Sequence, residues 1–458
     1  MINKHNKIII AGSGLVGSLL GLRLLQRGFD VELFESRSDM RKTDISAGRS
    51  INLALSHRGI RALKLAGIDQ EILSQAIQMK GRMIHDLKGN LQFQDYSLRP
   101  GEHINSISRR NLNVILMDAI EKIKPHAIHF NTRLVRTEKD CSVYFFEDQD
   151  KVEKSIYNAT LIGTDGAASI ARKMMFERTP QLRFNYSQSF QNYGYKELTI
   201  PPGIHKSFAI EKNALHIWPR GNFMMIGLPN PDATYTATIF LPYHGKDSFE
   251  LLQTKENVFQ FFETYFSDAV PIMPDLLEEF FAHATGHLYT VKCAPWNFED
   301  KILLMGDAAH AIIPFYGQGM NCGFEDVYEF DTLLDSYSDW GNLFHHFSNI
   351  RKPNGDAIAD LAEDNFIEMR DKVADPVFQR KRKLEMQLEK QFPAYFSKYA
   401  LVTFRPDISY YDAMIRGRKQ DAILMKICQN EKMEWSEIEI ETIFNSMNSE
   451  IGVLNSET

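Results

Sequence analysis

The pattern of apolar and polar positions at the start of the chain predicts a strand, a helix and a second strand. Residues 7–11 (KIIIA) form a short apolar run of the kind found in buried strands, and residues 31–34 (VELF) form another. Between them, residues 13–28 begin with glycines and continue with the apolar spacing of a helix. The first 35 residues therefore predict a β-α-β unit, which is the building block of a parallel sheet covered by helices.

Further along, the same pattern indicates more helices and strands and then a change of character. Residues 57–80 and 108–124 are predicted helices, and residues 128–163 contain three strand-like runs. Between about residues 180 and 290 the runs LHIWP, FMMIGL and TATIFLP are strand-like and are separated by turn signals rich in proline and asparagine. This part favours a sheet with one face toward a pocket.

The last part of the chain is predicted to contain one more buried strand, followed by helices. Residues 301–305 (KILLM) form the apolar run of a parallel strand, and the chain from residue 320 onward is mainly helical in pattern. The basic run Arg380-Lys381-Arg382-Lys383 lies within a helical pattern of Leu, Met and Glu. A solvated helix face is the expected explanation, and a localisation or lipid-binding patch is the alternative.

Composition narrows the class of protein. A length of 458 residues allows about three domains, and 44% hydrophobic with 24% charged residues is ordinary for a soluble globular protein. The net charge of −7 argues against a nucleic-acid-binding surface. Cys141, Cys293, Cys322 and Cys428 are widely separated and form no CxxC pair, so the sequence predicts neither a disulfide framework nor a metal site. A cytoplasmic protein is expected.

The uncharged stretch from Ile8 to Leu22 also resembles a secretory leader, because basic residues precede it. It is too short for a membrane-spanning helix, which needs about 20 apolar residues. Arg23 and Arg27 then interrupt it, and no small-residue cleavage site follows. The tail from Glu431 to Thr458 is polar, so no membrane anchor is expected there.

Glycine spacing gives the same stretch a different meaning. Gly12-Ser13-Gly14-Leu15-Val16-Gly17 is a GxGxxG motif between the first predicted strand and the first predicted helix. In such motifs the glycines allow a tight turn, close approach of a pyrophosphate and close helix packing, and the phosphates lie at the positive helix N-terminus. Glu35 ends the second strand 23 residues after Gly12, where a carboxylate can accept ribose hydroxyls. The pattern predicts a bound dinucleotide, FAD or NAD in preference to NADP.

Two further motifs bear on that choice. Leu161-Ile162-Gly163-Thr164-Asp165-Gly166 ends a buried strand in Asp-Gly, and Leu303-Leu304-Met305-Gly306-Asp307 ends another in Gly-Asp. A carboxylate at the C-terminal edge of a parallel strand can bind a ribityl hydroxyl, and the glycines of residues 317–321 open a helix whose N–H groups can face a flavin. Taken singly, each Asp could equally be a helix cap and each Gly a turn residue.

The three motifs in this order resemble those of the FAD-dependent aromatic hydroxylases, the group A flavoprotein monooxygenases. The chain has no second GxGxxG, so the resemblance implies a tightly bound FAD, transient binding of NADPH and O2 as co-substrate. It implies an α/β fold with a Rossmann-like, glutathione-reductase-like FAD-binding domain, an inserted mixed β-sheet substrate domain and a C-terminal helical region. The expected divisions are residues 1–75, 100–178 and 290–345 for FAD, residues 76–99 and 179–289 for substrate, and residues 346–458 for the helical domain.

Five further blocks resemble the branch of this family that hydroxylates L-kynurenine, and the similarity runs from about residue 7 to about residue 420. These blocks are Gly48–Gly59, Leu198–Pro202, Leu215–Arg220, His310–Phe315 and Asn365–Arg370. The resemblance implies hydroxylation at C3 to 3-hydroxy-L-kynurenine through a flavin C4a-hydroperoxide. No catalytic acid or base is assigned, because the aniline nitrogen of this substrate itself activates the ortho carbon and the cofactor carries the chemistry.

The resemblance also assigns residues to sites. Arg82 would bind the substrate carboxylate, for which the planar guanidinium is well suited, and Tyr96, Asn365 and Tyr399 would line the same pocket. Phe240 and Phe315 are candidates to pack against the aromatic ring. Without the resemblance, Arg82 would be interpreted as a surface arginine. The positions expected to bind FAD are Gly12, Gly14, Leu15, Val16, Gly17, Glu35, Arg37, Ala54, Arg109, Leu134, Asp165, Gly166, Asp307, Gly319, Met320 and Asn321.

Two alternatives to this function stay open at the level of sequence. One is a hydroxylase of the same fold that acts on another aromatic acid. The other is a non-catalytic binding protein of the kind represented by the Rab GDP-dissociation inhibitors, which have a GxGxxG motif and hold no flavin. The Gly306-Asp307 motif and the glycines that follow it argue against this second alternative.

Overall fold

The computed structural model describes residues 2, 4, 6–42, 52–372, 375–430 and 434–452. The chain forms two compact units. The first unit comprises Met1–Ala76, Ile107–Phe190 and Tyr289–Ala362, and the second comprises Ile77–Ser106, Gln191–Leu288 and Glu363–Thr458. The division into three domains made from the sequence stays a prediction. Part of the block Gly48–Gly59 lies outside the described residues.

The first unit is built on a six-stranded sheet in the order β18-β19-β12-β1-β2-β8. Every neighbouring pair except β18 with β19 is parallel. The three isoleucines of β1 are fully buried, as expected for a central strand covered on both faces. The Rossmann-like α/β fold is confirmed. The strands are β1 (Lys7–Ala11), β2 (Val31–Phe34), β8 (Ile128–His129), β12 (Ala159–Gly163), β18 (Asn297–Phe298) and β19 (Ile302–Leu304).

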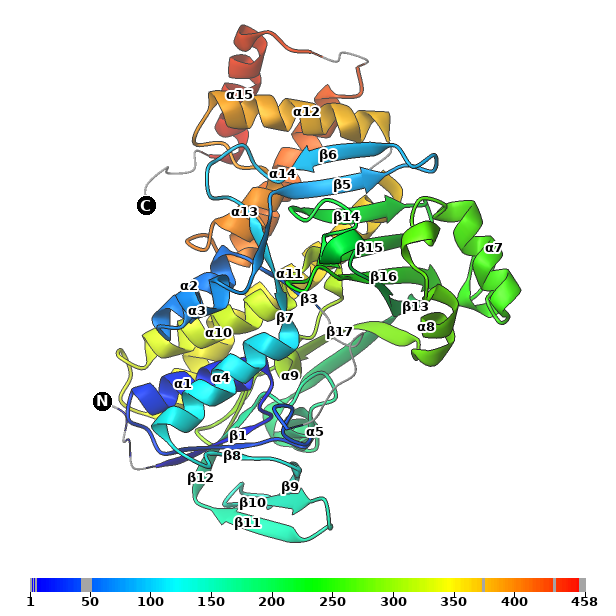
Figure 1. Ribbon diagram of the computed structural model, residues 1–458. Helices are drawn as coiled ribbons and strands as arrows, with labels where there is room; N and C mark the ends of the chain where they lie inside the picture. The colour runs from blue at the N-terminus through cyan, green and yellow to red at the C-terminus, as the bar shows by residue number, and fades with distance from the viewer. Residues whose placement is uncertain are drawn as a thin grey trace. The chain divides into compact units, whose positions relative to one another are not determined.

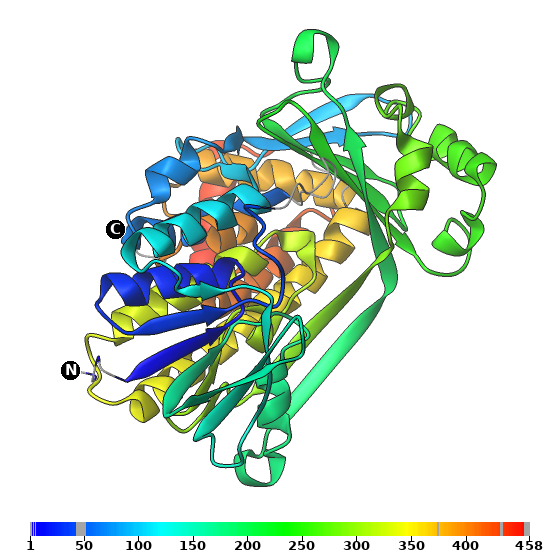
Figure 2. The same cartoon turned by 60° about the horizontal axis from the view of Figure 1, so that its bottom comes forward.

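Helices cover one face of this sheet and a smaller sheet covers the other. On the first face α1 (Leu15–Gln26) contacts α4 (Arg109–Ile123) and α10 (Gly319–Leu333), as Figure 1 shows. Figure 2 shows the three-stranded antiparallel sheet β11-β10-β9 on the opposite side of the parallel strands from α1. Its strands are β9 (Thr132–Thr137), β10 (Val143–Asp148) and β11 (Glu153–Tyr157). Phe34 of β2 stacks on Phe146 of β10 with ring centroids 4.0 Å apart, so the two sheets share one core.

The helix predicted over residues 57–80 is wrong in its last part. Helices α2 (His57–Leu65) and α3 (Asp69–Leu73) account for its beginning, but Ile77–Met79 forms strand β4. This strand pairs antiparallel with β7 (Ile104–Ser108), so its backbone hydrogen bonds come from a segment distant in sequence. The first unit also contains β3 (Asn52–Leu55), α5 (Ile170–Phe176), α9 (Asp307–His310) and most of α11 (Trp340–Ile367), which ends in the second unit.

The second unit contains most of a seven-stranded sheet in the order β17-β13-β16-β15-β14-β5-β6, in which β13 begins and β17 ends within the residues of the first unit. Helices α7 (Lys255–Tyr265) and α8 (Leu276–Ala282) pack against one face through a core that joins Phe262 and Phe280 to Trp218 and Ile239 of the sheet. The strands are β5 (Gly81–His85), β6 (Leu91–Asp95), β13 (Asn185–Ile200), β14 (Ala214–Pro219), β15 (Met224–Pro229), β16 (Tyr235–Pro242) and β17 (Gly286–Ala294).

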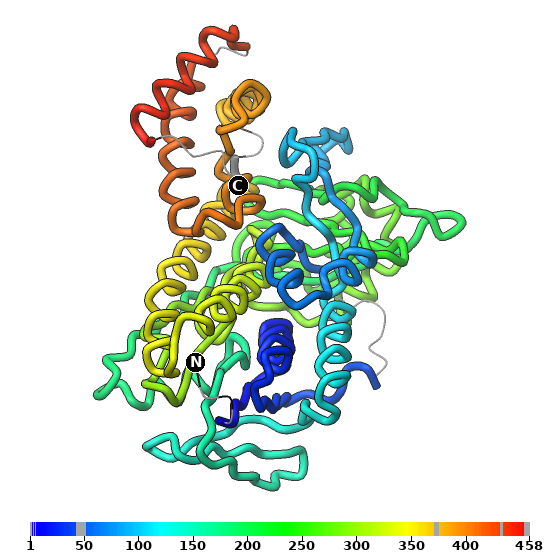
Figure 3. Tube along the Cα trace, turned by 90° about the vertical axis from the view of Figure 1, so that its left-hand side faces the viewer, coloured from blue at the N-terminus to red at the C-terminus, as the bar shows by residue number. Residues whose placement is uncertain are grey.

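The chain after residue 320 is mainly helical, as predicted. Figure 3 shows α14 and α15 (orange and red) side by side, and they share a core with α12. Each of these helices begins at a residue whose side chain accepts a backbone N–H of the first turn, and α15 has a full capping box. The helices are α12 (Pro376–Gln391), α13 (Lys398–Phe404), α14 (Tyr410–Ile427) and α15 (Glu437–Ile451). Within the described residues, none of the helices has both the length and the apolar character needed to cross a membrane.

The basic run in α12 is not the solvated face expected from the sequence. Arg380 and Lys381 are buried, and Arg380 Nε donates to the carbonyl of Cys428 at 3.0 Å. Lys381 Nζ lies 2.5 Å from a carboxylate oxygen of Asp421. Arg382 donates to the backbone carbonyl of Tyr96 at 3.1 Å. The run therefore anchors α12 inside the second unit, which single-helix charge spacing does not reveal.

Candidate cofactor and substrate sites

The turn between β1 and α1 has a backbone that requires glycine at two positions. Gly12 has φ of +95°, and a Cβ there would lie 2.6 Å from the carbonyl oxygen of Thr164. A Cβ on Gly17 would lie 2.1 Å from the carbonyl oxygen of Gly12, so the helix packs directly on the turn. At Gly14 no atom lies within 4 Å of the Cβ position, which leaves the backbone open to a ligand.

The first turn of α1 is available to an anion. Its N-cap is Gly14, which has no side chain to bond the first-turn N–H groups, and no acidic residue occupies that turn. Leu15 and Val16, both expected to contact the cofactor, provide two of these N–H groups. A helix N-terminus with an open backbone and no capping side chain fits the pyrophosphate of a dinucleotide.

Glu35 lies directly after β2 and is 3% exposed. Its carboxylate accepts the N–H of Ser13 at 3.0 Å and bonds Arg37 Nε at 2.8 Å. Burial alone would raise the pKa of this carboxyl, but the hydrogen bonds and charge of Arg37 hold it below its usual value. The side chain is therefore a carboxylate that connects the end of β2 to the glycine turn. The Arg37 side chain, 59% exposed, extends from it toward solvent.

Asp165 acts as a helix cap in this structure. Its carboxylate accepts the N–H groups of Ile170 at 2.7 Å and Ala171 at 3.1 Å, at the start of α5, and the hydroxyl of Ser169. Burial raises the pKa of the Asp165 carboxyl. The neighbouring Gly166 has φ of +78°, a conformation that favours glycine. The carboxylate thus shapes the Asp-Gly turn through its own backbone contacts.

The Gly-Asp motif presents a carboxylate at the end of β19. Gly306 has φ of 62°, and Asp307, the first residue of α9, is exposed. A carboxylate in that place fits the hydroxyl groups of a bound dinucleotide. Arg172 joins this turn to the Asp-Gly turn, because its guanidinium donates to the carbonyl of Ala308 at 2.8 Å and to the carbonyl of Ala167.

The N-terminus of α10 is fixed by Asn321. Its buried amide donates to the carbonyl of Ala54 in β3 at 2.8 Å and accepts the N–H of Ser56 at 2.9 Å. Gly319 precedes it at the first position of the helix, and the cap residue Gln318 makes no side-chain bond to the first turn. The helix start therefore keeps N–H groups available beside Ala54, the arrangement expected for a flavin edge.

Behind these motifs lies a buried network of charges. Asp326 of α10 accepts from Arg351 Nε at 2.8 Å and from His310 Nε2 at 2.6 Å. The adjacent Glu325 bonds Arg351 at 2.7 Å and Arg58 at 2.6 Å. Burial alone would lower the pKa of His310, but the Asp326 carboxylate holds it well above its usual value. The sequence analysis did not predict this network, and its only signal is the adjacent acidic pair at 325–326 in a helical pattern.

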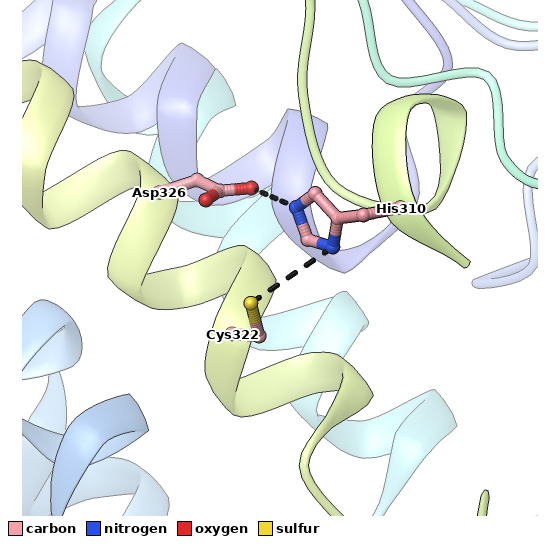
Figure 4. Close-up of side chains that lie close together, drawn as sticks. All are labelled: His310, Cys322 and Asp326. Atoms are coloured by element: carbon pink, nitrogen blue, oxygen red, sulfur yellow. Dashed lines mark hydrogen bonds and ion pairs between the residues drawn. The ribbon is translucent and has the colours of Figure 1, made fainter. Parts of the chain in front are cut away.

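Figure 4 shows that the His310 ring lies between the side chains of Asp326 and Cys322. Asp326 binds Nε2 of His310, whereas the sulfur of Cys322 lies 3.9 Å from Nδ1, the opposite nitrogen of the ring. A metal ion bound to either ring nitrogen would displace the contact that this nitrogen makes. Arg351 also donates to Asp326 and to the sulfur of Cys322, which brings a positive charge to the same groups.

In the second unit, Arg82 of β5 lies against two tyrosine rings. Its guanidinium carbon is 4.8 Å from the ring centroid of Tyr399 and 5.6 Å from that of Tyr96. The two rings stack on each other with centroids 5.1 Å apart and an interplanar angle of 11°. Burial raises the pKa of both phenols, so both are neutral hydroxyl groups near neutral pH. A cation beside two neutral hydroxyls is suited to binding a carboxylate.

Three distant segments bring these groups together. Tyr96 follows β6, and its backbone N–H donates to the carbonyl of Lys80 at 3.1 Å, one residue before β5 begins. Tyr399 belongs to α13, which Ser397 caps by accepting the N–H of Ala400. The side chain of Tyr96 is 2% exposed, and its phenolic oxygen is buried without a hydrogen-bond partner among the described residues. A buried unpaired hydroxyl is the kind of group that a polar ligand satisfies.

The strand register places Phe240 on the same face of the seven-stranded sheet as Arg82. Arg82 is opposite Leu215 in β14, and Phe240 of β16 is opposite Met224 in β15. Trp218 and its neighbours alternate with these residues and point toward α7 and α8. Arg82 and Phe240 therefore share the face that those two helices leave uncovered.

The remaining predicted positions are distributed over both units. Asn365 is buried near the end of α11, where its amide lies 3.2 Å from the sulfur of Met369 in the second unit. Phe315 is buried in the first unit, as are Tyr316 and Leu134. Arg109 is exposed at the start of α4.

The chain is similar to known proteins over most of its length. The family model described as an FAD binding domain matches residues 5–342. The kynurenine 3-monooxygenase of Myxococcus xanthus is 44% identical over 428 residues, which cover 93% of this chain and 91% of that protein. The kynurenine 3-monooxygenases of Cytophaga hutchinsonii (44% over 435 residues, 92% and 93%) and Legionella pneumophila (42% over 444 residues, 95% and 97%) are similar over comparable lengths.

Solved structures share the fold at lower identity. The tetrameric form of 2-methyl-3-hydroxypyridine-5-carboxylic acid oxygenase aligns with a TM-score of 0.66 and 18% identity, covering 84% of this chain and 98% of that one. Klebsiella pneumoniae HpxO, solved with FAD and uric acid, aligns with a TM-score of 0.64 and 15% identity over 82% of this chain and 93% of its own. These likenesses bear on the fold alone.

Proposed function

The chain belongs to the kynurenine 3-monooxygenase family, an FAD-dependent enzyme family, and on that premise we propose that it hydroxylates L-kynurenine at C3 to give 3-hydroxy-L-kynurenine. The co-substrates in this proposal are NADPH and O2. The non-catalytic binding protein considered from the sequence is set aside, because the family is enzymatic. The observation that carries the proposal is the position of Arg82 beside the stacked rings of Tyr96 and Tyr399.

The Arg82 cluster supports recognition of an α-amino acid through its carboxylate. The rings of Tyr96 and Tyr399 lie within cation–π distance of the guanidinium, and a carboxylate would bond its N–H groups. The neutral phenol of Tyr96 adds an uncharged donor, which is compatible with an anion beside it. In this proposal the cluster fixes one end of the substrate and thereby its orientation.

We propose that two phenylalanine side chains and one amide side chain contact the aromatic end of the substrate. Phe240 shares the sheet face of Arg82, and Asn365 is buried in the same unit. We assign Phe240 and Phe315 to packing against the aniline ring and Asn365 to its polar edge. No acid or base is assigned, since the aniline nitrogen donates electron density to the reacting carbon, and the residues' contribution is orientation and exclusion of water.

The residues proposed to hold FAD lie in the first unit. When bound, FAD would supply the redox chemistry that joins NADPH oxidation to transfer of one oxygen atom from O2. Gly12, Gly14, Leu15, Val16 and Gly17 would hold the pyrophosphate, and Glu35 the adenosine ribose. The other assigned positions are Arg37, Ala54, Arg109, Leu134, Asp165, Gly166, Asp307, Gly319, Met320 and Asn321.

Substitution of Arg82 tests the substrate assignment directly. Arg82→Ala removes paired charge-assisted hydrogen bonds worth about 3 kcal/mol, so the KM for L-kynurenine should rise roughly 100-fold while the flavin spectrum is unchanged. Steady-state NADPH oxidation measures the KM, and visible absorption of the purified protein records the flavin spectrum. Arg133→Ala, which removes an arginine whose side chain is 61% exposed, is the matched control and should leave KM unaltered.

An unchanged KM in Arg82→Ala would place the carboxylate elsewhere. A panel of other aromatic acids, run with the wild-type enzyme, covers the remaining alternative. Faster product formation from a phenol carboxylate than from L-kynurenine would replace the proposed substrate and keep the reaction class.

We further propose a cytoplasmic location. All four cysteines are free and buried, which is usual in a reducing compartment. Fractionation of cells that express the chain tests this, and recovery in the membrane or exported fraction would contradict it.

A further inference from the structure

Asp326 holds together the two flavin motifs of the first unit. One carboxylate oxygen, Oδ2, accepts the backbone N–H of Gly306 at 3.0 Å and lies 2.6 Å from His310 Nε2. The other, Oδ1, accepts from Arg351 at 2.8 Å. Asp326 is fully buried, and it lies on α10, the helix that begins at Gly319. A single side chain thus connects this helix to the turn that precedes Asp307.

The turn that Asp326 binds has a backbone conformation available only to glycine. Gly306 has φ of 62° and ψ of −144°, and a Cβ there would lie 3.0 Å from a methyl carbon of Val16 in α1. Such a conformation persists only when surrounding contacts hold it. The N–H of Gly306 bonded to the Asp326 carboxylate is such a contact, and it lies one residue before the exposed carboxylate of Asp307.

The charges around Asp326 explain why a buried carboxylate is tolerated there. His310 and Arg351 both donate to it, and Arg351 and Arg58 also donate to the adjacent Glu325. The His310 ring is further fixed by stacking on Trp296, with centroids 5.0 Å apart. Breaking one partner of such a buried set is costly, because the remaining charges are left without compensation. The network is therefore stiff at the point where it meets Gly306.

We propose that Asp326 is a positioning residue for FAD: through the Gly306 N–H and His310 it fixes the Gly306–Asp307 turn relative to the start of α10, so that the Asp307 carboxylate and the α10 amides are preset for the cofactor. The proposal rests on the FAD-dependent function proposed above but not on the identity of the substrate. Neither Asp326 nor His310 is expected to touch the reacting atoms.

Replacement of the carboxylate by an amide tests this role through cofactor affinity. Asp326→Asn replaces one acceptor oxygen by an NH2 group, which only donates. The remaining oxygen cannot accept from Gly306 N–H, His310 and Arg351 together, so the turn loses its fixed conformation. We expect the FAD dissociation constant of the apoprotein, measured by quenching of flavin fluorescence, to rise at least about tenfold. The visible spectrum of flavin that does bind should also change, because its surroundings are no longer fixed.

Asp331→Asn is the matched control on the same helix. Asp331 is also buried and pairs with two arginines, Arg23 and Arg27, but it contacts neither flavin motif. Both variants should lower the melting temperature of the apoprotein, and only Asp326→Asn should weaken FAD binding. Equal loss of FAD affinity in the two variants, or no loss in Asp326→Asn, would overturn the proposal.

Gly306→Ala provides an independent route, which also covers the case that Asp326→Asn does not fold. An alanine cannot adopt the Gly306 backbone, so it should weaken FAD binding to a similar degree with Asp326 intact. In the double variant the two losses should not add, since both act on one turn. Unchanged FAD affinity in Gly306→Ala, or fully additive losses, would contradict the proposal. FAD binding is measured without L-kynurenine, so a wrong substrate assignment would appear only in the product assay of the wild-type enzyme.

Discussion

At the scale of single residues, the protonation state of the two tyrosines decides what the Arg82 cluster can bind. Burial raises the pKa of Tyr96 and of Tyr399, so neither phenol becomes an anion that would compete for the guanidinium. The contacts with the ring faces, at 4.8 and 5.6 Å, hold the arginine by cation–π attraction. Arg82 is therefore a partly buried cation beside two neutral hydroxyl groups.

Removal of one phenolic hydroxyl should have a smaller effect than removal of Arg82. Tyr399→Phe keeps the ring stack and the cation–π contact but deletes a neutral hydrogen-bond donor, which is worth about 1 kcal/mol. We expect the KM for L-kynurenine to rise roughly fivefold with little change in kcat. Tyr157→Phe, at a side chain that is 64% exposed, is the control and should match the wild type. A KM equal to that of the wild type in Tyr399→Phe would remove the hydroxyl from substrate binding.

No spacing rule in the sequence could identify this cluster. Tyr96 is 14 residues and Tyr399 is 317 residues from Arg82 in the sequence. Taken alone, each is a residue type that is ordinary at the surface or in the core of a protein. Only resemblance to a family pointed to them. Gly12 and Gly17, in contrast, could be identified from the local sequence. The apolar pattern predicts the strand, turn and helix around them, and the GxGxxG motif itself indicates that the backbone requires glycine there.

At the scale of elements, a chain of hydrogen bonds ties β5 to β14 on the sheet face opposite to Arg82. His216 Nε2 donates to the carbonyl of Glu211 at 2.7 Å, and its Nδ1 lies 2.8 Å from His85 Nε2. His85 Nδ1 lies 2.6 Å from a carboxylate oxygen of Asp268, and Trp218 Nε1 donates to the same oxygen at 2.9 Å. Burial keeps His216 neutral by lowering its pKa to about 4.

The low pKa of His216 predicts that the folded protein loses stability in mild acid. The unfolded chain protonates His216 below pH 6.5, whereas the folded protein resists protonation down to about pH 4, so stability falls as the pH decreases between these values. The contribution of this one group is up to roughly 3 kcal/mol. Urea unfolding at several pH values should therefore show a shallower dependence in His216→Gln than in the wild type. His244→Gln, at a side chain 84% exposed, should keep the slope of the wild type, and a slope unaltered in His216→Gln would contradict the assignment.

The elements also show where sequence patterns stop being informative. The β-α-β start was predicted correctly, since apolar runs and glycines act within a few residues. The end of the helix predicted over 57–80 was wrong because β4 depends on pairing with β7. The basic run of α12 was misinterpreted because its partners, such as Asp421 and the carbonyl of Tyr96, come from other segments. Each error concerns an interaction between distant parts of the chain.

At the scale of the whole molecule, the chain has one unit proposed to bind FAD and a second unit that contains the proposed carboxylate site. The family model matches residues 5–342, and relatives that are 42–44% identical cover more than nine-tenths of the chain. The order of the three flavin motifs was sufficient to predict the fold from the sequence. The buried network around Asp326 was not predictable in this way, because its members gain meaning only when α9, α10 and α11 are packed together.

The most direct test of the central claim is the product formed by the purified, FAD-loaded enzyme from L-kynurenine, NADPH and O2. We expect 3-hydroxy-L-kynurenine, identified by mass and by comparison with the authentic compound, in an amount close to the NADPH consumed. NADPH oxidation that yields only hydrogen peroxide, or no hydroxylated product from L-kynurenine, would contradict it.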